Sequence, residues 1–524
     1  MIESIEFSKL KYFSKLFIDF INGSNDILDF FDNNNSFEIK FEKRLLETEN
    51  KRTFLNEAIK NSITKINLSD NQKLNLESLK LSNTLLVVTG QQPAIFGGPL
   101  YNIYKSLTAI FLCNKLNEQF QKYNFVPIFW IEDNDSDTEE INNAILLDNE
   151  YNLIKNYLEI PKKRIFSHIN ISKEDVYKSF EIQILNSIED DNLLSDLFIQ
   201  YINYYLKDYG LLYIKSSELL KSNYYKDFIK REFSEPGKSK FLIDSNNNDL
   251  LRRNYHIQAI ATDINFFYIK NGYRYRIELK DNKFSIDDNK FEKNDMFDLI
   301  ENHYYNFIPK VLFRPLFQDY FLPTAAYIGG PSEIAYLAQL KNLYKDYKIT
   351  MPIIYPRHSI TILNNFAIRN LSKINKTTDY FFQKYELIEK EFSIGLIESD
   401  LEELFEIEIN NIKKIYDELF LKIKDIDKTL EVNKNVAIAK SLDILSDFRK
   451  KTISALKKKH QVELNRIKKL HNFLFPMNLP QERVLNSHFF LSRYDIDFLK
   501  LKFNEIFIND PNKHYIVEFN DLSN

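Results

Sequence analysis

The stretch LLVVTGQQPAIFGGPLYNIYK, residues 85–105, decides the fold predicted for this chain. Residues 85–88 are apolar, as is typical of a strand covered on both faces, and the strand ends at Thr89. Gly97 and Gly98 then allow a sharp turn into a helix. A helix that begins at the carboxyl end of a parallel strand can bind an anion. The stretch therefore predicts either a ligand-binding loop or a tight structural turn.

Further strands and turns extend this pattern and predict an α/β fold. An apolar run at 125–131 follows the first helix, and a further apolar run lies at 143–148. This order of strand, helix and strand favours a parallel sheet. Another strand, glycine pair and helix start follow at 325–333. The glycine spacing at 85–105 is that of neither a dinucleotide-binding fingerprint nor a P-loop. Asn271-Gly272, between INFFYIK and YRYRIEL, predicts a β-hairpin.

Length, charge and cysteine content exclude several classes of protein. A chain of 524 residues exceeds one typical core, so we expect more than one lobe. A net charge of −4 argues against a nucleic-acid partner. The single cysteine, Cys113, excludes an internal disulfide and a cysteine-based zinc cluster, and it fits a small core residue better than a nucleophile. Without a signal sequence or a membrane-spanning apolar run, we expect a cytoplasmic protein with no membrane partner.

Changes in pattern divide the chain into six predicted segments. They are an N-terminal helical cover at 1–80, the first part of the core at 81–150, an inserted helical region at 151–262 with a strand at 211–215, the second part of the core with the hairpin at 263–370, an antiparallel coiled coil at 371–470, and a C-terminal segment at 471–524 that returns to the core and ends in a strand at 515–519.

Apolar residues recur at steps of three and four in the fifth segment, as in a coiled-coil seam. The first run comprises Ile412, Ile415, Leu419, Ile423, Ile426 and Leu430, and the second comprises Ile453, Leu456, Leu464 and Ile467. A break near 433–435 predicts a helical hairpin. Such a seam favours either a homodimer or pairing of the two helices within one chain.

An acidic loop, EDNDSDTEE at 132–140, follows the strand at 125–131. Two charges about 4 Å apart near a surface interact by roughly 4 kcal/mol, so these carboxylates must be hydrated, protonated or paired with cations. The loop is either a solvated surface feature or a pocket that holds an ammonium, a metal or a general base. Its position after a buried strand favours the pocket.

Other candidate residues follow the later strands. Arg314 is a natural bidentate partner of a carboxylate, although an ion pair at a sheet edge is the alternative. Arg357 and His358 follow the strand MPIIYP, where a lone histidine is more typical of a structural hydrogen bond. No H-E-x-x-H or G-x-S-x-G motif occurs, which argues against zinc and serine hydrolases.

Five blocks together closely resemble the bacillithiol-biosynthesis cysteine-adding enzymes. They are TGQQPAIFGGPLYNIYK, FVPIFWIEDNDSDTEEIN, FRPLFQDYFLPTAAYIGGPSEIAYLAQLK, MPIIYPR and FPMNLPQERVLN. The resemblance implies a Rossmann-like parallel-sheet core with inserted connecting regions and a C-terminal helical coiled-coil domain that mediates dimerisation. It also implies a ligase that joins cysteine to glucosaminyl-malate by an amide bond, in the last step of bacillithiol biosynthesis.

The resemblance assigns site residues as well. The catalytic candidates are Asp135, Asp137 and Glu140, and the substrate-binding candidates are Thr89, Gly90, Gln91, Gln92, Gly97, Gly98, Tyr101, Arg314, Gln318, Tyr327, Gly329, Gly330, Ser332, Glu333 and Arg357. No protein-bound metal site is expected. Because a free carboxylate must be activated before it condenses with an amine, ATP with magnesium is the expected cofactor.

The chain departs from the family in its acidic loop. The family usually carries Glu-Asp-His-Asp, whereas Asn134, Asp135, Ser136 and Asp137 occupy these positions here. Histidine is the side chain best suited to transfer a proton near neutral pH. Its loss leaves a second hypothesis open: a catalytically weakened paralogue that acts as a dimeric nucleotide- or metabolite-binding protein. Nucleotidyl transfer is a third, disfavoured by the absence of H-I-G-H-like and K-M-S-K-S-like motifs.

Overall fold

A computed structural model describes residues 2–31, 36–172, 174, 192–395, 399–427, 429–494, 496–507 and 511–519. The chain divides into two compact units, each considered by itself. Unit 1 comprises residues 1–148, 153–365 and 479–524, and unit 2 comprises residues 149–152 and 366–478. Part of the inserted region predicted at 151–262 lies outside the described residues.

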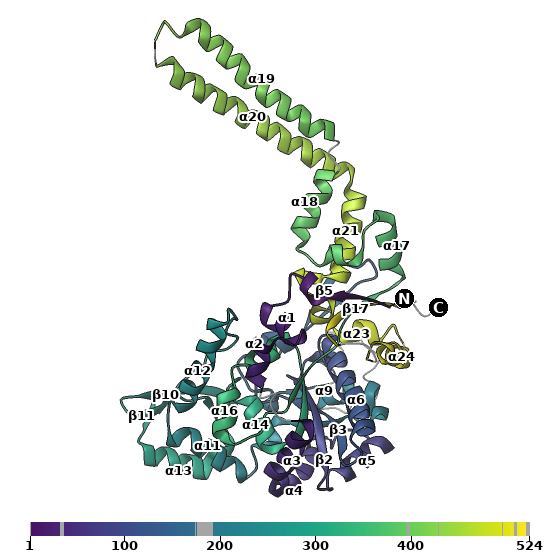
Figure 1. Ribbon diagram of the computed structural model, residues 1–524, viewed down its shortest axis with the longest axis vertical. Coiled ribbons are helices and arrows are strands. Elements are labelled where there is room, and N and C mark those ends of the chain that lie inside the picture. The colour runs from purple at the N-terminus through teal and green to yellow at the C-terminus, as the bar shows by residue number, and fades with distance from the viewer. Residues whose placement is uncertain are drawn as a thin grey trace. The chain divides into compact units, whose positions relative to one another are not determined.

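The centre of unit 1 is a five-stranded parallel sheet (Figure 1). Its strands in spatial order are β15 (Ile353–Pro356), β14 (Thr324–Gly329), β2 (Thr84–Gln91), β3 (Asn124–Ile131) and β8 (Leu212–Lys215). Counted along the chain, this order is 3-2-1-4-5 from the β8 edge, which is the order of a doubly wound Rossmann sheet. The predicted α/β class and parallel sheet are confirmed.

The central strands are buried because helices cover them. In β2 every residue except the last is buried, as the apolar run at 85–88 predicted. Helix α6 (Tyr101–Gln119) packs on β2 and β3, while α3 (Phe37–Thr48) packs on β2 and β14 and α4 (Arg52–Ser62) packs on β8. Phe41 of α3 contacts the ring of Phe125 on β3, with centroids 5.2 Å apart.

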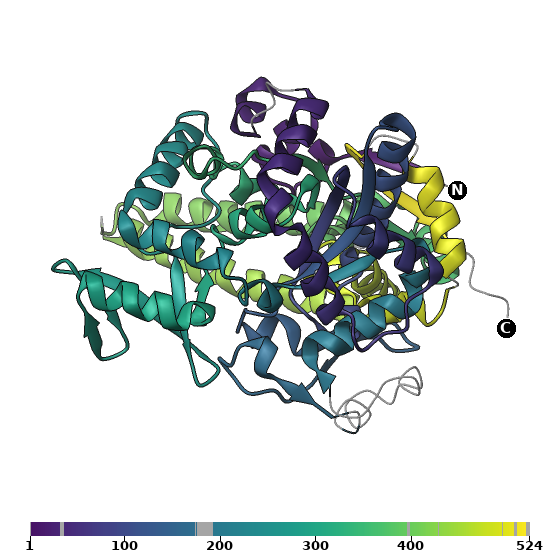
Figure 2. The same ribbon diagram turned by 90° about the horizontal axis from the view of Figure 1, so that it is seen from below.

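The predicted hairpin belongs to a second, antiparallel sheet, which lies beside the central one in the teal part of Figure 2. Its order is β12 (Asn289–Phe291), β11 (Lys283–Ile286), β10 (Tyr273–Lys280), β9 (Phe266–Lys270) and β13 (Phe307–Pro309). Lys270 pairs with Tyr273 across the turn. Asn271 and Gly272 have φ angles of 55° and 81°, the left-handed conformation that a two-residue hairpin turn requires.

Two strands differ from the sequence prediction. The segment 1–80 is not wholly helical, because β1 (Ile2–Glu6) pairs with β17 (Lys513–Glu518), which also pairs with β16 (Ser359–Leu363). A short, partly exposed strand such as β1 depends on a partner from the far end of the chain. The apolar run at 143–148 forms β4 (Asn143–Leu147) in an antiparallel pair with β5 (Leu153–Tyr157), outside the parallel sheet.

The remaining elements of unit 1 connect these sheets. Strands β6 (Asn170–Ile171) and β7 (Asn192–Leu193) form a short pair. The helices are α1 (Lys15–Ile21), α2 (Asn25–Leu28), α5 (Asp70–Ser78), α7 (Thr138–Ile141), α9 (Leu194–Leu206), α10 (Ser216–Leu219), α11 (Tyr224–Ser234), α12 (Lys238–Arg252), α13 (Lys293–His303), α14 (Arg314–Phe321), α15 (Pro331–Leu337), α16 (Lys341–Tyr347), α22 (Gln481–Val484), α23 (Ser487–Leu491) and α24 (Ile496–Phe507). None of the helices within the described ranges is long and apolar enough to cross a membrane.

Unit 2 contains a long antiparallel helical hairpin, α19 (Ser399–Ile423) and α20 (Leu430–Lys459). Tyr416 and Ser441 hydroxyls lie 3.0 Å apart across it, and the rings of Phe405 and Phe448 are 6.2 Å apart. The hairpin is confirmed, but the break predicted near 433–435 is wrong. The break lies earlier, between the end of α19 at Ile423 and the start of α20 at Leu430. The polar residues 433–435 belong to α20, where lysine and asparagine lie on its surface. Helices α17 (Asn365–Ile374), α18 (Tyr385–Gly395) and α21 (Gln461–Leu474) complete the described part of the unit.

Replacing Gly90 by alanine should destabilise the central sheet. A Cβ atom at Gly90 would lie 2.8 Å from Trp130 Cβ and 2.9 Å from the Trp130 carbonyl oxygen, on the neighbouring strand. We expect Gly90→Ala to lower the free energy of unfolding by about 1–3 kcal/mol in urea titrations. Gly329→Ala is the control, since its nearest neighbour would be 3.4 Å away. Equal stabilities of the two variants would contradict this.

His514 on β17 should make stability depend on pH. Its imidazole is buried between the hydroxyls of Ser359 and Thr361, each 2.9 Å away. Burial lowers its pKa to about 4, against about 6.5 in an unfolded chain. The unfolded state therefore binds more protons between these values, and stability falls as the pH falls.

At pH 5, protonation of His514 in the unfolded state lowers the free energy of unfolding by about 2 kcal/mol relative to neutral pH. Denaturant unfolding of the wild type and of His514→Asn between pH 7 and 5 should show a shallower slope for the variant. The other buried histidines are unchanged in both proteins, so the difference reports on His514. Parallel slopes would refute the assignment.

Candidate active site

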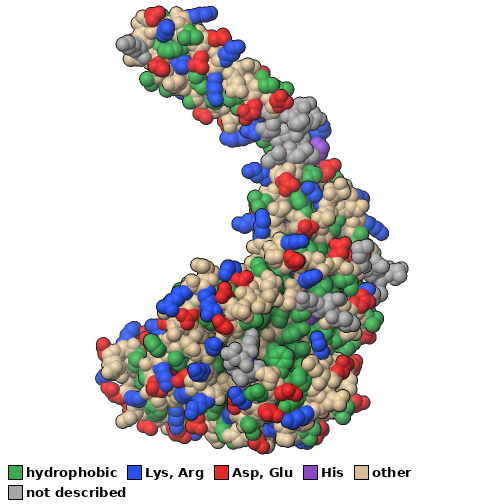
Figure 3. Space-filling model, in the orientation of Figure 1, with side chains coloured by type: hydrophobic (Ala, Val, Ile, Leu, Met, Phe, Trp, Pro, Cys, Tyr) green, Lys and Arg blue, Asp and Glu red, His purple; other side chains and the backbone are tan. Residues whose placement is uncertain are grey.

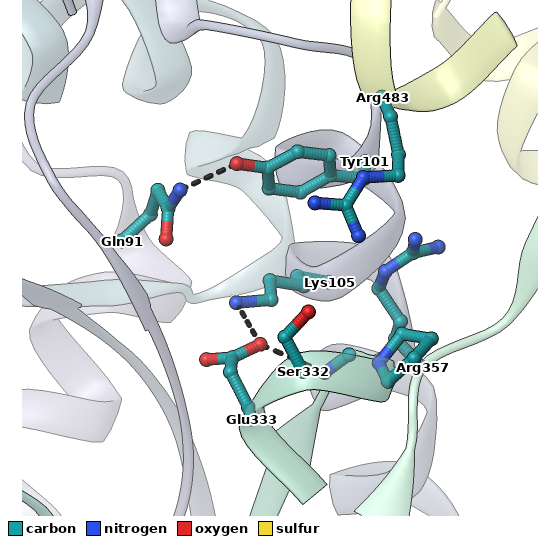
Figure 4. A pocket seen from close by; sticks show the side chains of 9 residues that line it. Gln91, Tyr101, Lys105, Ser332, Glu333, Arg357 and Arg483 are labelled. Carbon is teal, nitrogen blue, oxygen red and sulfur yellow. Dashed lines mark hydrogen bonds and ion pairs between the residues drawn. The ribbon is translucent and has the colours of Figure 1, made fainter. Parts of the chain in front are cut away.

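A cavity opens at the carboxyl edge of the central sheet, between β2 and β14. The strand order reverses there, and this is where doubly wound sheets bind their ligands. The cavity has a volume of about 140 Å³. We call it the switch-point cavity; its lining residues are Gln91, Tyr101, Lys105, Gly330, Pro331, Ser332, Glu333, Arg357 and Arg483 (Figure 4).

Helix α6 contributes Tyr101 and Lys105, which are four residues apart and therefore lie on one helical face. Lys105 is only 2% exposed, so its ammonium group requires partners. It donates to the Gly90 carbonyl at 2.8 Å and forms an ion pair with Glu333 Oε2 at 2.6 Å. Burial lowers the pKa of Lys105, and Glu333 opposes that shift. The Tyr101 hydroxyl accepts a hydrogen bond from Gln91.

The corner between β14 and α15 holds Glu333 in one position. Glu333 Oε2 accepts from the Gly330 N–H at 2.7 Å, and Oε1 accepts from the Tyr327 hydroxyl at 2.7 Å. With Lys105, these contacts occupy both carboxylate oxygens. Glu333 therefore neutralises Lys105 and fixes the floor of the cavity.

Two arginines reach toward Tyr101 from different elements (Figure 4). Arg357 follows β15 and forms a 2.6 Å ion pair with Glu482, and both side chains are at most 4% exposed. Arg483 is half-buried and makes no ion pair with any residue that the structure describes. Since Glu333 is the one carboxylate among the lining residues, the cavity carries an excess of positive charge suited to an anion.

The C-terminal segment QERVLN, residues 481–486, completes this cavity. The Gln481 amide bonds the backbone of Ile362 on β16 as donor and acceptor, at 3.1 and 2.8 Å. Glu482 accepts from the Ser359 hydroxyl and the Ile360 N–H, each at 2.9 Å. The next residue, Arg483, lines the cavity. The contacts of Gln481 and Glu482 with β16 therefore place Arg483 next to Arg357, which is more than a hundred residues earlier in the chain.

The acidic loop is paired with arginines. Asp135 forms ion pairs with Arg274 and Arg314, both at 2.8 Å, and accepts from Gln92 at 2.8 Å. Burial alone would raise the pKa of Asp135, but Arg314 and Arg274 hold it well below its usual range. Asp135 is therefore a permanent anion at neutral pH. Its Oδ1 also accepts from the Ser136 N–H at 2.7 Å.

The other acidic residues of the loop fall into two groups. Glu132 and Asp133 are buried, and burial raises the pKa of each. Asp133 accepts from the Ser217 hydroxyl at 2.6 Å, which ties the loop to α10. Asp137 and Glu140 are exposed. The loop is thus neither a solvated surface feature nor a uniform acidic pocket.

Of the predicted binding residues, Gln91, Tyr101, Gly330, Ser332, Glu333 and Arg357 lie together in the switch-point cavity. Others lie elsewhere. Gly97 and Gly98, with φ angles of 72° and 67°, form a turn outside it. The Leu100 N–H at the start of α6 donates to the Leu485 carbonyl at 3.0 Å, so this helix end is engaged within the protein.

Several remaining candidates have structural contacts. Thr89 donates to the Ile328 carbonyl across the sheet at 3.2 Å. Gln318 donates at 3.2 Å to the buried Asp319, which also accepts from the Tyr344 hydroxyl at 2.6 Å. Cys113 is buried, and burial raises the pKa of its thiol well above the usual value, as expected of a core residue. Burial also lowers the pKa of His358 to about 3.

Sequence reasoning did not select Lys105, Arg274, Glu482 or Arg483. For Lys105, the helical spacing from Tyr101 was an available signal. For the other three, no local pattern distinguishes them from surface charges. Within the part of the chain that the structure describes, no group of three or more histidine, cysteine, aspartate or glutamate side chains could hold a metal ion.

The sequence matches two family models in succession. Residues 1–358 match the N-terminal Rossmann-like domain of the bacillithiol biosynthesis protein BshC. Residues 360–519 match its C-terminal coiled-coil domain. The first range contains all five strands of the parallel sheet, and the second contains the helical hairpin.

Curated relatives are similar over most of their length. The protein named "Putative cysteine ligase BshC" from Flavobacterium psychrophilum is 28% identical over 506 residues, covering 92% of this chain and 93% of the relative. The protein of the same name from Chlorobium phaeobacteroides is 28% identical, covering 83% of each chain. That from Chlorobaculum tepidum is 27% identical, covering 84% of this chain and 85% of the relative. With both domain models matched in order, the chain belongs to the BshC family of bacillithiol biosynthesis.

Proposed function

We propose that this protein is a ligase that joins the carboxyl group of cysteine to the amino group of glucosaminyl-malate. Membership of the BshC family supports a cysteine ligase. The observation that carries the substrate assignment is the guanidinium of Arg483, which lines the cavity without an ion pair among the described residues, whereas Lys105 and Arg357 are paired with Glu333 and Glu482. The malyl group of the acceptor bears carboxylates, which are the natural partners of arginine and lysine.

In this proposal the malyl carboxylates bind in the switch-point cavity. Arg314, the carboxylate partner expected from the sequence, already faces Asp135 and lies 3.7 Å from Glu132. Arg483 has no such ion pair among the described residues and is the more available cation. Asp135 keeps its charge and positions Arg274 and Arg314. Asp137 and Glu140, at the protein surface, are the carboxylates open to the amino group and its proton.

Activation of cysteine belongs to the proposal on chemical grounds alone. An amine displaces AMP from an acyl-adenylate or phosphate from an acyl-phosphate, and the amine loses a proton in either case. We therefore propose ATP with magnesium as co-substrate. Release of AMP and pyrophosphate, or of ADP and phosphate, distinguishes the two routes.

Replacing Arg483 by glutamine should weaken acceptor binding. Loss of one charge-assisted contact costs about 1.5–3 kcal/mol, so KM for glucosaminyl-malate should rise roughly tenfold or more. The kcat value should change less, because the cavity binds a part of the acceptor remote from the new bond. Product is measured by mass spectrometry with cysteine, ATP and magnesium, and with an ATP-free control.

Arg493→Gln is the matched control, because Arg493 is exposed and its guanidinium donates to the Phe489 carbonyl, away from the switch-point cavity. Its KM should equal that of the wild type. If the wild type forms no cysteinyl amide, the ligase proposal fails. If product forms but Arg483→Gln keeps the wild-type KM, the cavity is not the malyl site.

We also propose that the α19–α20 hairpin mediates a homodimer. One side of each helix packs within the hairpin, but further apolar side chains remain exposed among charged ones (Figure 3). The predicted seam divides accordingly: Ile412 and Ile423 are half-buried, whereas Ile415, Leu419 and Ile426 are 51–77% exposed. Further exposed apolar residues are Leu404, Ile407, Val436, Ile444 and Phe448. Burial of these apolar side chains against a second copy of the hairpin favours association of two chains.

Charge on this exposed face should therefore produce monomers. The double variant Leu419→Glu/Ile426→Glu places carboxylates where the partner would pack, at a cost of several kcal/mol per buried ion. Sedimentation velocity should show a dimer for the wild type and a monomer for the variant. Lys414→Glu, at an exposed position of α19, should remain dimeric. A dimer in the double variant would place the interface elsewhere.

A further inference from the structure

A second cavity lies beside the antiparallel sheet, away from the residues that line the switch-point cavity. It has a volume of about 630 Å³. Strand β9, the turn at Asn271-Gly272, residues 286–291 and the segment 164–168 contribute to its lining. We call it the hairpin cavity. Strands β10 and β11 and helix α13 mark this region in Figure 1.

The segment 164–168 is fixed from both sides. On one side, Arg164 pairs with Tyr273 of β10, and the Ile165 N–H donates to the Gly272 carbonyl at 2.9 Å. On the other side, the next two N–H groups donate to the carbonyls of Asp135 at 2.9 Å and Asp133 at 2.7 Å. The wall of the cavity is therefore held in place without a ligand.

Two cationic side chains, Arg164 and Lys270, line this cavity together with the imidazole of His168, whose pKa is lowered by burial and by Arg164. None forms an ion pair with a residue that the structure describes, and the buried Nε of Arg164 has no hydrogen-bond partner. A Cβ atom at Gly272 would lie 3.1 Å from His168 Nδ1 and 3.2 Å from Arg164 Nε. The side chains of His168 and Arg164 therefore both lie against the turn at Gly272.

The rest of the lining suits an organic group next to an anion. Tyr268 and Lys270 are two residues apart on β9 and so point to the same face of the strand. Tyr268 and Phe291 supply aromatic surface, and Asn289 and Asn306 supply amides. Asp287 is the one carboxylate among the described lining residues.

We infer that the hairpin cavity binds a phosphate-bearing ligand, with the phosphate on Arg164, Lys270 and His168 and the organic part against Tyr268. Two cations, Arg164 and Lys270, with an imidazole beside them match a multiply charged anion better than a single carboxylate. An unpaired, partly buried guanidinium gains most from such a partner. This assignment does not depend on the proposed ligase activity, because it concerns different residues and a binding event.

Isothermal titration calorimetry of the full-length protein with pyrophosphate and with ADP tests this site. The wild type should bind at least one of the two probes, and Arg164→Gln and Lys270→Gln should each weaken that binding about tenfold. Lys280→Gln removes the same charge from an exposed position of β10 that pairs with Glu278, and it should bind like the wild type. Tighter binding of ADP than of pyrophosphate identifies a nucleotide, and equal binding identifies recognition of phosphate alone.

Three results would overturn the inference. One is no binding of either probe by the wild type. Another is equal weakening in Lys270→Gln and Lys280→Gln, which indicates attraction to net charge. The third is binding that Arg483→Gln abolishes and Lys270→Gln leaves intact, which assigns the phosphate to the switch-point cavity. Lys270 is exposed at a strand end, so its variant keeps the test valid if Arg164→Gln does not fold.

Discussion

The ion pair between Arg357 and Glu482 is the contact on which the candidate active site depends. Both side chains are almost completely buried, and breaking such a pair by removing one partner costs about 3–5 kcal/mol. Glu482 also binds the Ser359 hydroxyl and the Ile360 N–H. The pair therefore joins a segment near the end of the chain to the strands after the central sheet, and it brings Arg483 to the cavity edge.

Charge is distributed in opposite ways at the two neighbouring sites on this sheet edge. In the switch-point cavity, Lys105 is neutralised by Glu333, while Arg483 keeps its charge for a ligand. In the acidic loop, Asp135 is balanced by two arginines and stays ionised. Ser136, where the resemblance led us to expect a histidine, lies next to a carboxylate that stays ionised and does not act as a proton carrier at neutral pH.

The acidic loop also connects the core to the inserted sheet. Arg274, on β10, reaches Asp135, and backbone carbonyls of Asp133 and Asp135 hold the wall of the hairpin cavity. Binding in that cavity would thus bear on the same loop that carries the catalytic candidates. The helical hairpin of unit 2 contributes a separate property, an exposed apolar face suited to a second copy of the chain.

The sequence by itself determined the parallel α/β core, the β-hairpin at Asn271-Gly272, the helical hairpin and the family, because each is encoded by local periodicity, turn residues or contiguous motifs. It also selected Tyr101, Glu333 and Arg357 as candidates, and the structure brings these three together in the switch-point cavity. Only the tertiary structure decided that β1 pairs with β17, that Asp135 is paired with arginines, and that Arg483 completes the cavity. These features depend on contacts between residues far apart in the chain, and the burial and charge balance that such contacts create leave no local signal.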